Sequence, residues 1–436
     1  MDVLAFSRLQ FGDTAAFHIL WPIMSIGLSL FMLVMEALWL YTNDERYYRQ
    51  LRFWTKIFIL TFAIGTVSGI PLEFEFGTNW AAFSSAAGDF FGNVLGFEST
   101  VAFALEAAFL GIFVFGWQRV SRGVHLFANA MIFVGATLSA FWIMAANSWM
   151  QVPVGVVVEG GKLIVSNYSA AIFNPDTLVS FAHMWVACVE TTLFMMAGIC
   201  ALVLLSKADS AKKNFFLDTF KYCLVLAIAV VPLQLAIGHM SGLVAIKYQP
   251  QKVAAFEMHS DTNPAGQGAP LVLVPGVSIP NGLSMLLTDS PTGRVQGLND
   301  FAADDRPIDT EATIVFWSFR LMVGIGFILF FLMAAGVWCW YKNKLQTRAF
   351  LWLWVLAMPL GFVATEAGWM VREIGRQPWV VYHLMRTSAG VSSNLNPATV
   401  AATTVIFTLM YLAFGALFIY FTYRIVKTGP EFETKI

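Results

Sequence analysis

The fold is indicated most directly by residues 350–379, which read FLWLWVLAMPLGFVATEAGWMVREIGRQPW. The stretch begins as an apolar run of membrane-spanning length, closes on the acidic residue Glu366, and then enters a turn rich in Arg, Gly and Pro. Placing a carboxylate inside a bilayer costs roughly 2.5–3.5 kcal/mol on insertion scales. The segment therefore predicts a membrane helix whose acid has a functional partner.

The composition of the whole chain favours the same class of protein. Hydrophobic residues make up 58% of the 436 positions and charged residues only 12%, whereas soluble domains carry about 25% charged residues. The net charge of −1 argues against nucleic-acid binding, which needs a clustered basic surface. The four cysteines lie in apolar runs without metal-ligand spacing, so we expect buried free thiols.

Runs of about 20 apolar residues predict an all-α, polytopic membrane bundle that forms a single domain over residues 1–436. The chain start lacks the features of a cleaved signal, so we expect the first span to be retained. An odd number of helices would place the two termini on opposite sides. The nine predicted helices cover residues 14–41, 53–76, 94–117, 124–150, 178–205, 219–246, 312–341, 350–371 and 398–426.

The distribution of positive charge predicts the orientation of the bundle. Lys and Arg gather in the connections after the first, third, fifth and seventh predicted helices, and such connections are typically cytoplasmic. The N-terminus and the connections 77–93, 151–177, 247–311 and 372–397 would then face outward. Because long loops are often functional, the polar connection 247–311 between helices six and seven is a candidate substrate-facing loop.

Three arginines break this charge rule. Arg372, Arg376 and Arg386 lie in an outward-facing connection. One interpretation is that they pair with fixed negative charge such as cofactor propionates, since guanidinium groups bind carboxylates in a bidentate manner. The alternative is an interfacial loop with ordinary snorkelling arginines.

Potential iron ligands occur on several helices at similar predicted depth. Imidazole, thioether and carboxylate groups on different helices of a bundle are what embedded haem irons require. Singly, a histidine at a helix start is more often a packed or interfacial residue, and a methionine is more often gap filler. The joint pattern favours ligands, toward the outer side of the membrane: His18, Glu98, His183, Met322 and Glu366.

Two further acids lie deeper along the same helices. Glu106 follows Glu98 by eight residues, about 12 Å at 1.5 Å per residue, and Glu190 follows His183 by seven. Acids below an outer redox site suggest proton delivery from the cytoplasm, although a buried neutral carboxyl group is the structural alternative. Three other acids, Glu36, Glu73 and Glu75, lie near span ends, where snorkelling would suffice.

The outward connection contains one more candidate pair. In KVAAFE, Lys252 and Glu257 are five residues apart and Phe256 lies beside them. A donor, a base and an aromatic ring would suit a quinol ring, but by spacing alone an ordinary solvated pair is the better interpretation.

Several blocks of the chain together resemble subunit I of cytochrome bd-type quinol oxidases. The blocks are LQFGDTAAFH (9–18), EFEFGTNW (73–80), FESTVAFALEAAFLG (97–111), SAFWIMAANSWMQ (139–151) and the EAGW and GRQPW motifs of 365–379. The likeness extends over essentially the whole chain. GRQPW after an intramembrane EAGW is its most specific element.

The resemblance implies a role for each candidate residue. His183 and Met322 resemble the axial pair of a low-spin haem b. His18 resembles a ligand in a di-haem oxygen site, with Glu98 on or beside that haem and Glu366 on the neighbouring one. The remaining matches are Glu106 and Ser139 for proton access, Lys252 and Glu257 for the quinol loop, and Arg8, Arg320 and Arg376 for propionate binding or site shaping.

The family resemblance also implies an activity. Such subunits oxidise quinol at the outer face of the bacterial inner membrane and reduce O2 to water with cytoplasmic protons, which is electrogenic without proton pumping. The implied cofactors are a low-spin haem b, a high-spin haem b and haem d, or a third haem b in its place. The implied partners are subunit II and, in some members, a small single-helix subunit, with no nucleic acid. The N-terminus would lie outside and the C-terminus in the cytoplasm.

Three features depart from the pattern of the family. The loop 247–311 lacks a long insertion, so the chain resembles the short-loop branch that includes cyanide-insensitive oxidases. Phe362 stands where Trp is expected, and His239 stands where an acid is expected. His239 is interpreted as a packed or interfacial histidine, with a local proton acceptor as the alternative.

Two functions from other classes share some of these features. A cation- or proton-coupled transporter also needs intramembrane carboxylates and broken helices. A non-catalytic scaffold for another redox subunit would tolerate replacement of the His and Met positions. A visible absorption spectrum distinguishes all three.

Overall fold

The computed structural model describes residues 2–431, and within them nine helices are long and apolar enough to cross a membrane. The expected all-α membrane bundle is therefore confirmed. The spans are α1 (Val3–Thr42), α2 (Glu45–Gly77), α3 (Ala81–Phe97) continuing to α4 (Ala104–Phe115), α5 (Arg122–Gln151), α7 (Thr177–Leu205) after the short α6 (Tyr168–Ile172), α8 (Ser210–Tyr248), α11 (Asp309–Tyr341), α12 (Arg348–Ala357) with α13 (Leu360–Ile374), and α15 (Pro397–Thr428).

Polar residues in the short connections define where the helices begin. Asp2, Asp44, Ser121, Asp209 and Asn396 each accept a hydrogen bond from a backbone N–H of the following first turn. Such caps satisfy donors that the helix itself leaves unpaired. Together with short connections, they fold consecutive helices back as antiparallel neighbours.

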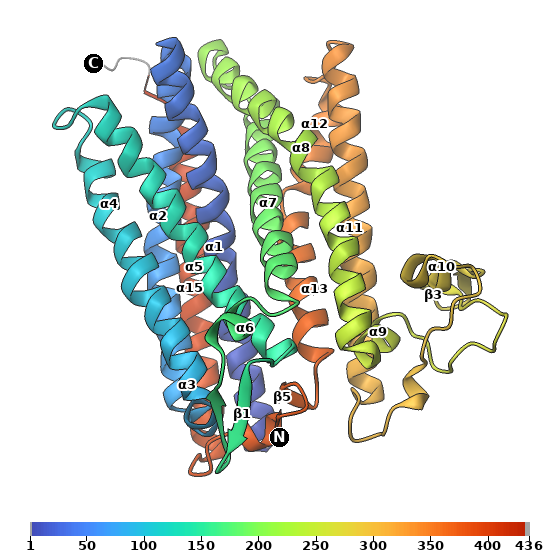
Figure 1. The fold of residues 1–436 in the computed structure, drawn as a ribbon. Helices are drawn as coiled ribbons and strands as arrows, with labels where there is room; N and C mark the ends of the chain where they lie inside the picture. Colours follow the sequence, from blue (N-terminus) through green and yellow to red (C-terminus); the bar gives the residue numbers. More distant parts are fainter. Residues whose placement is uncertain (1, 432–436) are drawn as a thin grey trace.

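The bundle has two different ends (Figure 1). One end carries the N-terminus and the connections 152–167, 249–308 and 375–396, and we call it the loop end. It also holds the hairpins β1 (Val156–Glu159) with β2 (Lys162–Val165) and β5 (Trp379–Val381) with β6 (Met385–Arg386). The short-turn end carries the connections 43–44, 116–121, 206–209 and 342–347 and, in the view of Figure 1, the last described residues.

Four helices begin well before their predicted starts: the first at Val3, the second at Glu45, the third at Ala81 and the sixth at Ser210. The third span begins at Ala81, so residues 81–93 are helix and not loop, and Glu98 lies in mid-span at the start of a π-helical segment, Glu98–Phe103. The run AAFSSAAGDFFGN contains many small and polar residues, so its hydropathy is too low to predict a membrane span. The first helix begins at Val3, so His18 lies four turns inside it. π-Helical turns inside α-helices often mark functional positions.

Helix α7 lies at the centre of the bundle and packs against α1, α5, α8, α12 and α13. Close approach depends on glycines in the neighbouring helices. A Cβ on Gly27 of α1 would lie 2.3 Å from Thr192, and one on Gly361 of α13 would lie 2.6 Å from Thr191. These contacts hold α1 and α13 against α7 with a fixed alignment.

The connection 249–308 is partly structured. It contains α9 (Pro250–Phe256), the hairpin of β3 (Leu271–Val274) and β4 (Val277–Ile279), α10 (Gly282–Thr288) and a single 3₁₀ turn, Leu298–Asp300. Helix α9 is buried and packs against α8 and α11, while the part around β3 and α10 projects beside the bundle (Figure 1).

Candidate functional site

Helix α7 provides a common reference for depth. Thr192 Oγ1 donates a hydrogen bond of 3.0 Å to the carbonyl of Ile23, and Gly27 touches the same threonine. Because α1 and α7 run in the same direction (Figure 1), His18 lies opposite Trp185. Helix α13 runs the other way and places Gly361 against Thr191, so Glu366, five residues later, lies opposite Val186.

His183 and Met322 lie in the same layer. Met322 of α11 contacts Gly368 of α13, where an added Cβ would be 3.0 Å from Sδ. Gly368 is seven residues beyond Gly361 and therefore lies opposite Met184. The ring of His183 contacts Gly238 of α8, where a Cβ would be 3.1 Å from Cε1.

Glu98 joins this layer through α5. Ser139 Oγ donates a hydrogen bond of 2.5 Å to Glu98 Oε1. Two residues earlier on α5, Thr137 Oγ1 accepts a hydrogen bond of 3.3 Å from Trp185 Nε1. All five predicted ligands thus align with positions 183–186 of α7, within about 5 Å of helix rise. We call this group the ligand layer: His18, Glu98, His183, Met322 and Glu366.

The hydrogen bonds around His18 define its tautomer. Ser68 Oγ lies 3.0 Å from His18 Nδ1 and 3.0 Å from the carbonyl of Gly65. The carbonyl can only accept, so Ser68 donates to Gly65 and accepts from Nδ1–H of His18. The other nitrogen, Nε2, then carries a free lone pair. A histidine oriented in this way is typical of metal ligation.

Two other members of the ligand layer have buried polar atoms without partners. Among the described residues, neither Nδ1 of His183 nor Oε1 of Glu366 finds a hydrogen-bond partner. Buried polar atoms are normally paired. Both atoms therefore fit a bound group that supplies the missing contact.

Glu366 also lines an apolar cavity of ≈ 360 Å³. Its wall combines residues from α1, α11 and α13: Leu20, Ser318, Leu321, Phe362, Val363, Glu366, Ala367 and Met370. An apolar cavity with one carboxylate in its wall suits a flat hydrophobic cofactor whose metal the carboxylate would bind. Phe362, where the family pattern led us to expect Trp, lies in this wall.

The described residues contain no cluster of three or more His, Cys, Asp or Glu that could hold a metal ion by itself. The ligand layer instead distributes one donor to each of five helical segments. Such spacing suits irons whose equatorial positions are filled by a macrocycle, because each then needs only one or two protein ligands. The chemistry of the donor set therefore fits haem.

The arginines at the loop end are paired mainly with protein carboxylates. Arg372 donates to Asp176 Oδ2 at 2.6 Å, and Arg386 donates to Asp304 Oδ2 at 3.0 Å. These contacts do not support the prediction that both arginines pair with cofactor propionates. Arg8 pairs with Glu311 at 2.8 Å. Arg376 differs, because one nitrogen contacts Glu373 while Nε and Nη1 have no partner within residues 2–431.

Lys252 and Glu257 are both buried, so the interpretation as a solvated pair was wrong. Lys252 Nζ donates to Gln151 Oε1 at 2.6 Å and to the carbonyl of Arg372 at 3.0 Å. Burial, followed by the positive charge of Arg372, holds the pKa of Lys252 well below its usual range. The lysine thus connects α9 to the ends of α5 and α13.

Glu257 pairs instead with Arg320 of α11 at 2.5 Å. Burial raises the pKa of Glu257, and the Arg320 guanidinium partly opposes that shift. A carboxylate with a raised pKa is well suited to accept a proton near neutral pH.

The deeper acids are buried as predicted for them. Glu106 is 7% exposed and contacts the backbone position of Gly135 on α5, and Glu190 is 6% exposed on α7. His239, expected to be packed or interfacial, is exposed on α8, which agrees with an interfacial position.

Two buried acids were misjudged from the sequence. Glu75 was expected to snorkel, but it is 2% exposed and accepts a hydrogen bond of 2.7 Å from Thr14. Glu36 was expected to snorkel, but its side chain is fully buried and is bound by His125 and Asn129. No spacing rule connects these residues, since they meet only through the packing of α1 on α5.

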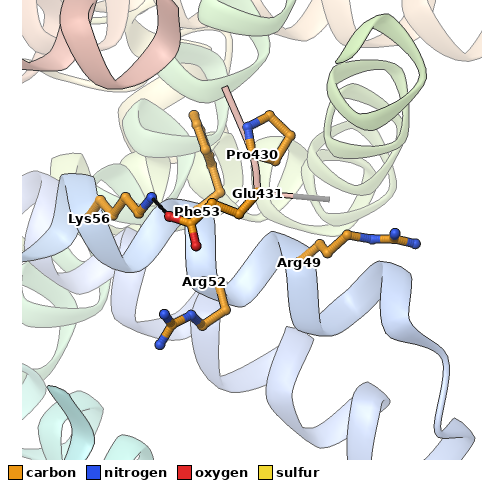
Figure 2. A pocket seen from close by; sticks show the side chains of 6 residues that line it. All are labelled: Arg49, Arg52, Phe53, Lys56, Pro430 and Glu431. Carbon is orange, nitrogen blue, oxygen red and sulfur yellow. Dashed lines mark hydrogen bonds and ion pairs between the residues drawn. The ribbon is translucent and has the colours of Figure 1, made fainter. Parts of the chain in front are cut away.

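The short-turn end contains a minor pocket of ≈ 10 Å³, lined by Arg49, Arg52, Phe53, Lys56, Pro430 and Glu431 (Figure 2). Lys56 Nζ lies 2.6 Å from Glu431 Oε1, and this hydrogen bond lowers the pKa of Glu431. The space suits a water molecule at most. The contact fixes the chain after α15 to the basic start of α2.

Comparisons with known proteins agree over nearly the full length. The family model described as cytochrome bd terminal oxidase subunit I matches residues 6–430. The chain is 34% identical to cytochrome bd ubiquinol oxidase subunit 1 of Bacillus subtilis (strain 168), covering 99% of this chain and 95% of the relative. It is 29% identical to cytochrome bd-II ubiquinol oxidase subunit 1 of Escherichia coli (strain K12), covering 99% and 97%. The structure of bd oxidase from Geobacillus thermodenitrificans matches with a TM-score of 0.89 at 29% identity, over 98% of this chain and 99% of that one.

Proposed function

Because this chain belongs to the cytochrome bd terminal oxidase subunit I family, we propose that its ligand layer holds three haems. Membership makes the chain a multi-pass subunit of a bacterial respiratory quinol oxidase, and therefore an oxidoreductase with haem cofactors that works in a membrane complex with other subunits. The transporter and scaffold alternatives do not agree with this membership.

The single observation that supports this proposal is the alignment of five donor side chains with positions 183–186 of α7. His183 and Met322 would hold a low-spin haem b. His18, Glu366 and Glu98 would hold the two haems of the oxygen site, a high-spin haem b and haem d, or a third haem b in place of haem d. When bound, the irons supply one-electron transfer and the reduction of oxygen to water.

Arg376 is the best candidate for a propionate partner. Its side chain is 4% exposed and has two unpaired guanidinium nitrogens in the described structure. A buried guanidinium normally satisfies all of its donors with anions or carbonyls. Arg8 and Arg320 already pair with Glu311 and Glu257, so they shape the site through these acids.

Quinol oxidation is assigned to the loop end, beside α9. Glu257 would accept a proton from quinol, because it is buried, raised in pKa and supported by Arg320. Lys252 would position α9 through its bonds to Gln151 and Arg372. The connection 249–308 would be the quinol loop and would face the outside of the inner membrane, with the N-terminus outside and the C-terminus in the cytoplasm.

Proton uptake is assigned to the opposite side of the ligand layer. Glu106 lies eight residues beyond Glu98 toward the short-turn end, and Ser139 connects α5 to Glu98. Protons released at the loop end and taken up through Glu106 would make turnover electrogenic without a proton pump. We further propose subunit II, and a small single-helix subunit, as partners in the complex.

The number of bound haems tests the proposed site. The purified complex should contain three haems for each copy of this chain, by chemical extraction and visible spectroscopy. A preparation that oxidises quinol with fewer than three haems would contradict the proposed ligand set.

A further inference from the structure

A second buried acid–base group lies outside the ligand layer. Glu36 Oε1 is 2.6 Å from His125 Nδ1, and Glu36 Oε2 accepts a hydrogen bond of 2.7 Å from Asn129 Nδ2. His125 Nε2 is 2.9 Å from the carbonyl of Phe113. We call Glu36, His125 and Asn129 the triad, and each member is at most 4% exposed.

The partners of the triad determine how many protons it holds. The carbonyl of Phe113 can only accept, so His125 Nε2 must carry a proton. A second proton must lie between His125 Nδ1 and Glu36 Oε1, either on the ring or on the carboxyl group, because an ionised carboxylate and a bare nitrogen would repel each other. The pair therefore shares one proton that can lie on either partner.

The triad lies between Glu106 and the short-turn end. Phe113 follows Glu106 by seven residues on α4, which is about 10 Å of helix rise. On α5, Asn129 precedes Gly135, the contact of Glu106, by six residues, or about 9 Å. Two helices thus give the same separation, and both place the triad on the side from which protons would arrive.

Aromatic rings separate the triad from the short-turn surface. The centroids of the His125 and Trp117 rings are 4.2 Å apart, and the Arg52 guanidinium carbon lies 4.5 Å from the centroid of the Trp117 ring. Arg122 similarly lies over Trp39. Trp117 follows Phe113 and Arg122 precedes His125 toward the short-turn end, so both cations lie on the outer side of the triad. On its inner side, Asn129 Oδ1 has no partner within the described chain and is available to a water molecule.

We propose that the Glu36–His125 pair is a relay that supplies protons to Glu106. This inference rests on the proposed uptake route through Glu106. In the transfer, the shared proton leaves the pair through water and arrives on the Glu106 carboxylate. The pair then carries one negative charge until it regains a proton from water at the short-turn end, so charge and atoms balance over the cycle.

The variant Glu36→Gln separates this role from a purely structural one. The amide oxygen can accept from Asn129, and the amide nitrogen can donate to His125 Nδ1 while Nε2–H still donates to Phe113. Every hydrogen bond of the triad is preserved, but the shared proton is lost. The matched reference is Glu106→Gln, which blocks the proposed acceptor itself.

We expect Glu36→Gln to unfold at the wild-type temperature and to accept electrons from quinol at the wild-type rate. Its oxygen turnover should fall by roughly 10²-fold, the typical contribution of a positioned proton-transfer group, and Glu106→Gln should fall equally. Wild-type turnover in Glu36→Gln beside a slow Glu106→Gln would overturn the relay and leave the proposed function intact. Wild-type turnover in both variants would instead contradict the uptake route.

A spectroscopic measurement covers the case in which Glu36→Gln does not assemble. Glu36→Asp retains a carboxyl group one methylene shorter. In time-resolved infrared difference spectra recorded during oxygen reduction, when the pair is transiently deprotonated, we expect the carboxyl band of the wild type to shift in this variant. Identical spectra would overturn the relay, because a carboxyl group that never changes its protonation gives no difference band.

Discussion

The hydroxyl group of Ser68 accepts a hydrogen bond from Nδ1 of His18 across 3.0 Å. This bond joins α1 to α2 and leaves Nε2 of His18 as the nitrogen with a free lone pair. The Ser68 side chain thus orients the imidazole that we propose as a ligand, as hydrogen-bond partners of metal-binding histidines typically do.

Removing this hydroxyl should weaken the oxygen site alone. Ser68→Ala leaves His18 Nδ1 without its partner, and loss of such a supporting bond typically reduces metal affinity or activity by about 10–100-fold. We expect oxygen consumption and haem retention at this site to fall while the low-spin spectrum persists. Ser68→Thr, which keeps the hydroxyl, is the control, and equal loss in both variants would argue against the role of the bond.

The glycine beside His183 should be intolerant of a methyl group. A Cβ at Gly238 would lie 3.1 Å from His183 Cε1, so Gly238→Ala should displace the ring, perturb the low-spin spectrum and cost about 1–3 kcal/mol of stability. The matched control is Gly242→Ala on the same helix, where a Cβ would meet no described atom within 4 Å. Equal effects from both variants would exclude a specific contact with His183.

Quinol oxidation should depend on the ionisation of Glu257. The base acts only when deprotonated, so the rate should rise with pH, and burial moves that rise above the pH of an exposed glutamate. Removing the Arg320 guanidinium takes away the group that lowers the pKa of Glu257. Arg320→Met should therefore shift the pH profile of haem reduction by quinol further toward alkaline pH.

The pH profile of a Glu257 variant can contradict this assignment. Glu257→Gln should abolish the rise and reduce the rate by roughly 10²-fold at alkaline pH, where the wild-type carboxylate is ionised. A variant that retains the wild-type rise would show that another group accepts the proton.

Oxygen consumption in sealed vesicles tests the arrangement of proton release and uptake. Proteoliposomes supplied with quinol should build a membrane potential during turnover, because the proposed sites of proton release and uptake lie at opposite ends of the bundle. A dye that reports the potential provides the measurement. Oxygen consumption without any membrane potential would contradict the proposed arrangement of proton release and uptake.

Much of the fold could be predicted from the sequence, because a bilayer demands long apolar runs that are visible in any window of about 20 residues. The span Ala81–Phe115 was found only in part, since small and polar residues at 81–93 lower its local hydropathy. Asp89 in this run accepts hydrogen bonds from the backbone N–H of Val165 and from the hydroxyl group of Tyr168, and a linear pattern does not show such partners.

The site was predictable to a different degree. The ligand layer was indicated by residue types at matching depth, since helix rise converts position into depth. The partners of Arg372 and Lys252 were not, because both side chains bind groups more than 100 positions away. The triad around Glu36 was missed for the same reason: whether an acid near a span end reaches water or a histidine depends on how α1 and α5 pack.

The ligand assignment is tested most directly by the reduced-minus-oxidised visible spectrum of the Met322→Leu variant, with His18→Ala measured beside it. Leucine has a similar volume to methionine but lacks the thioether, so Met322→Leu should lose the low-spin haem signal and its reduction by quinol. His18→Ala should keep that signal and lose oxygen chemistry. A low-spin spectrum unchanged in Met322→Leu, or oxygen reduction at the wild-type rate in His18→Ala, would contradict the account.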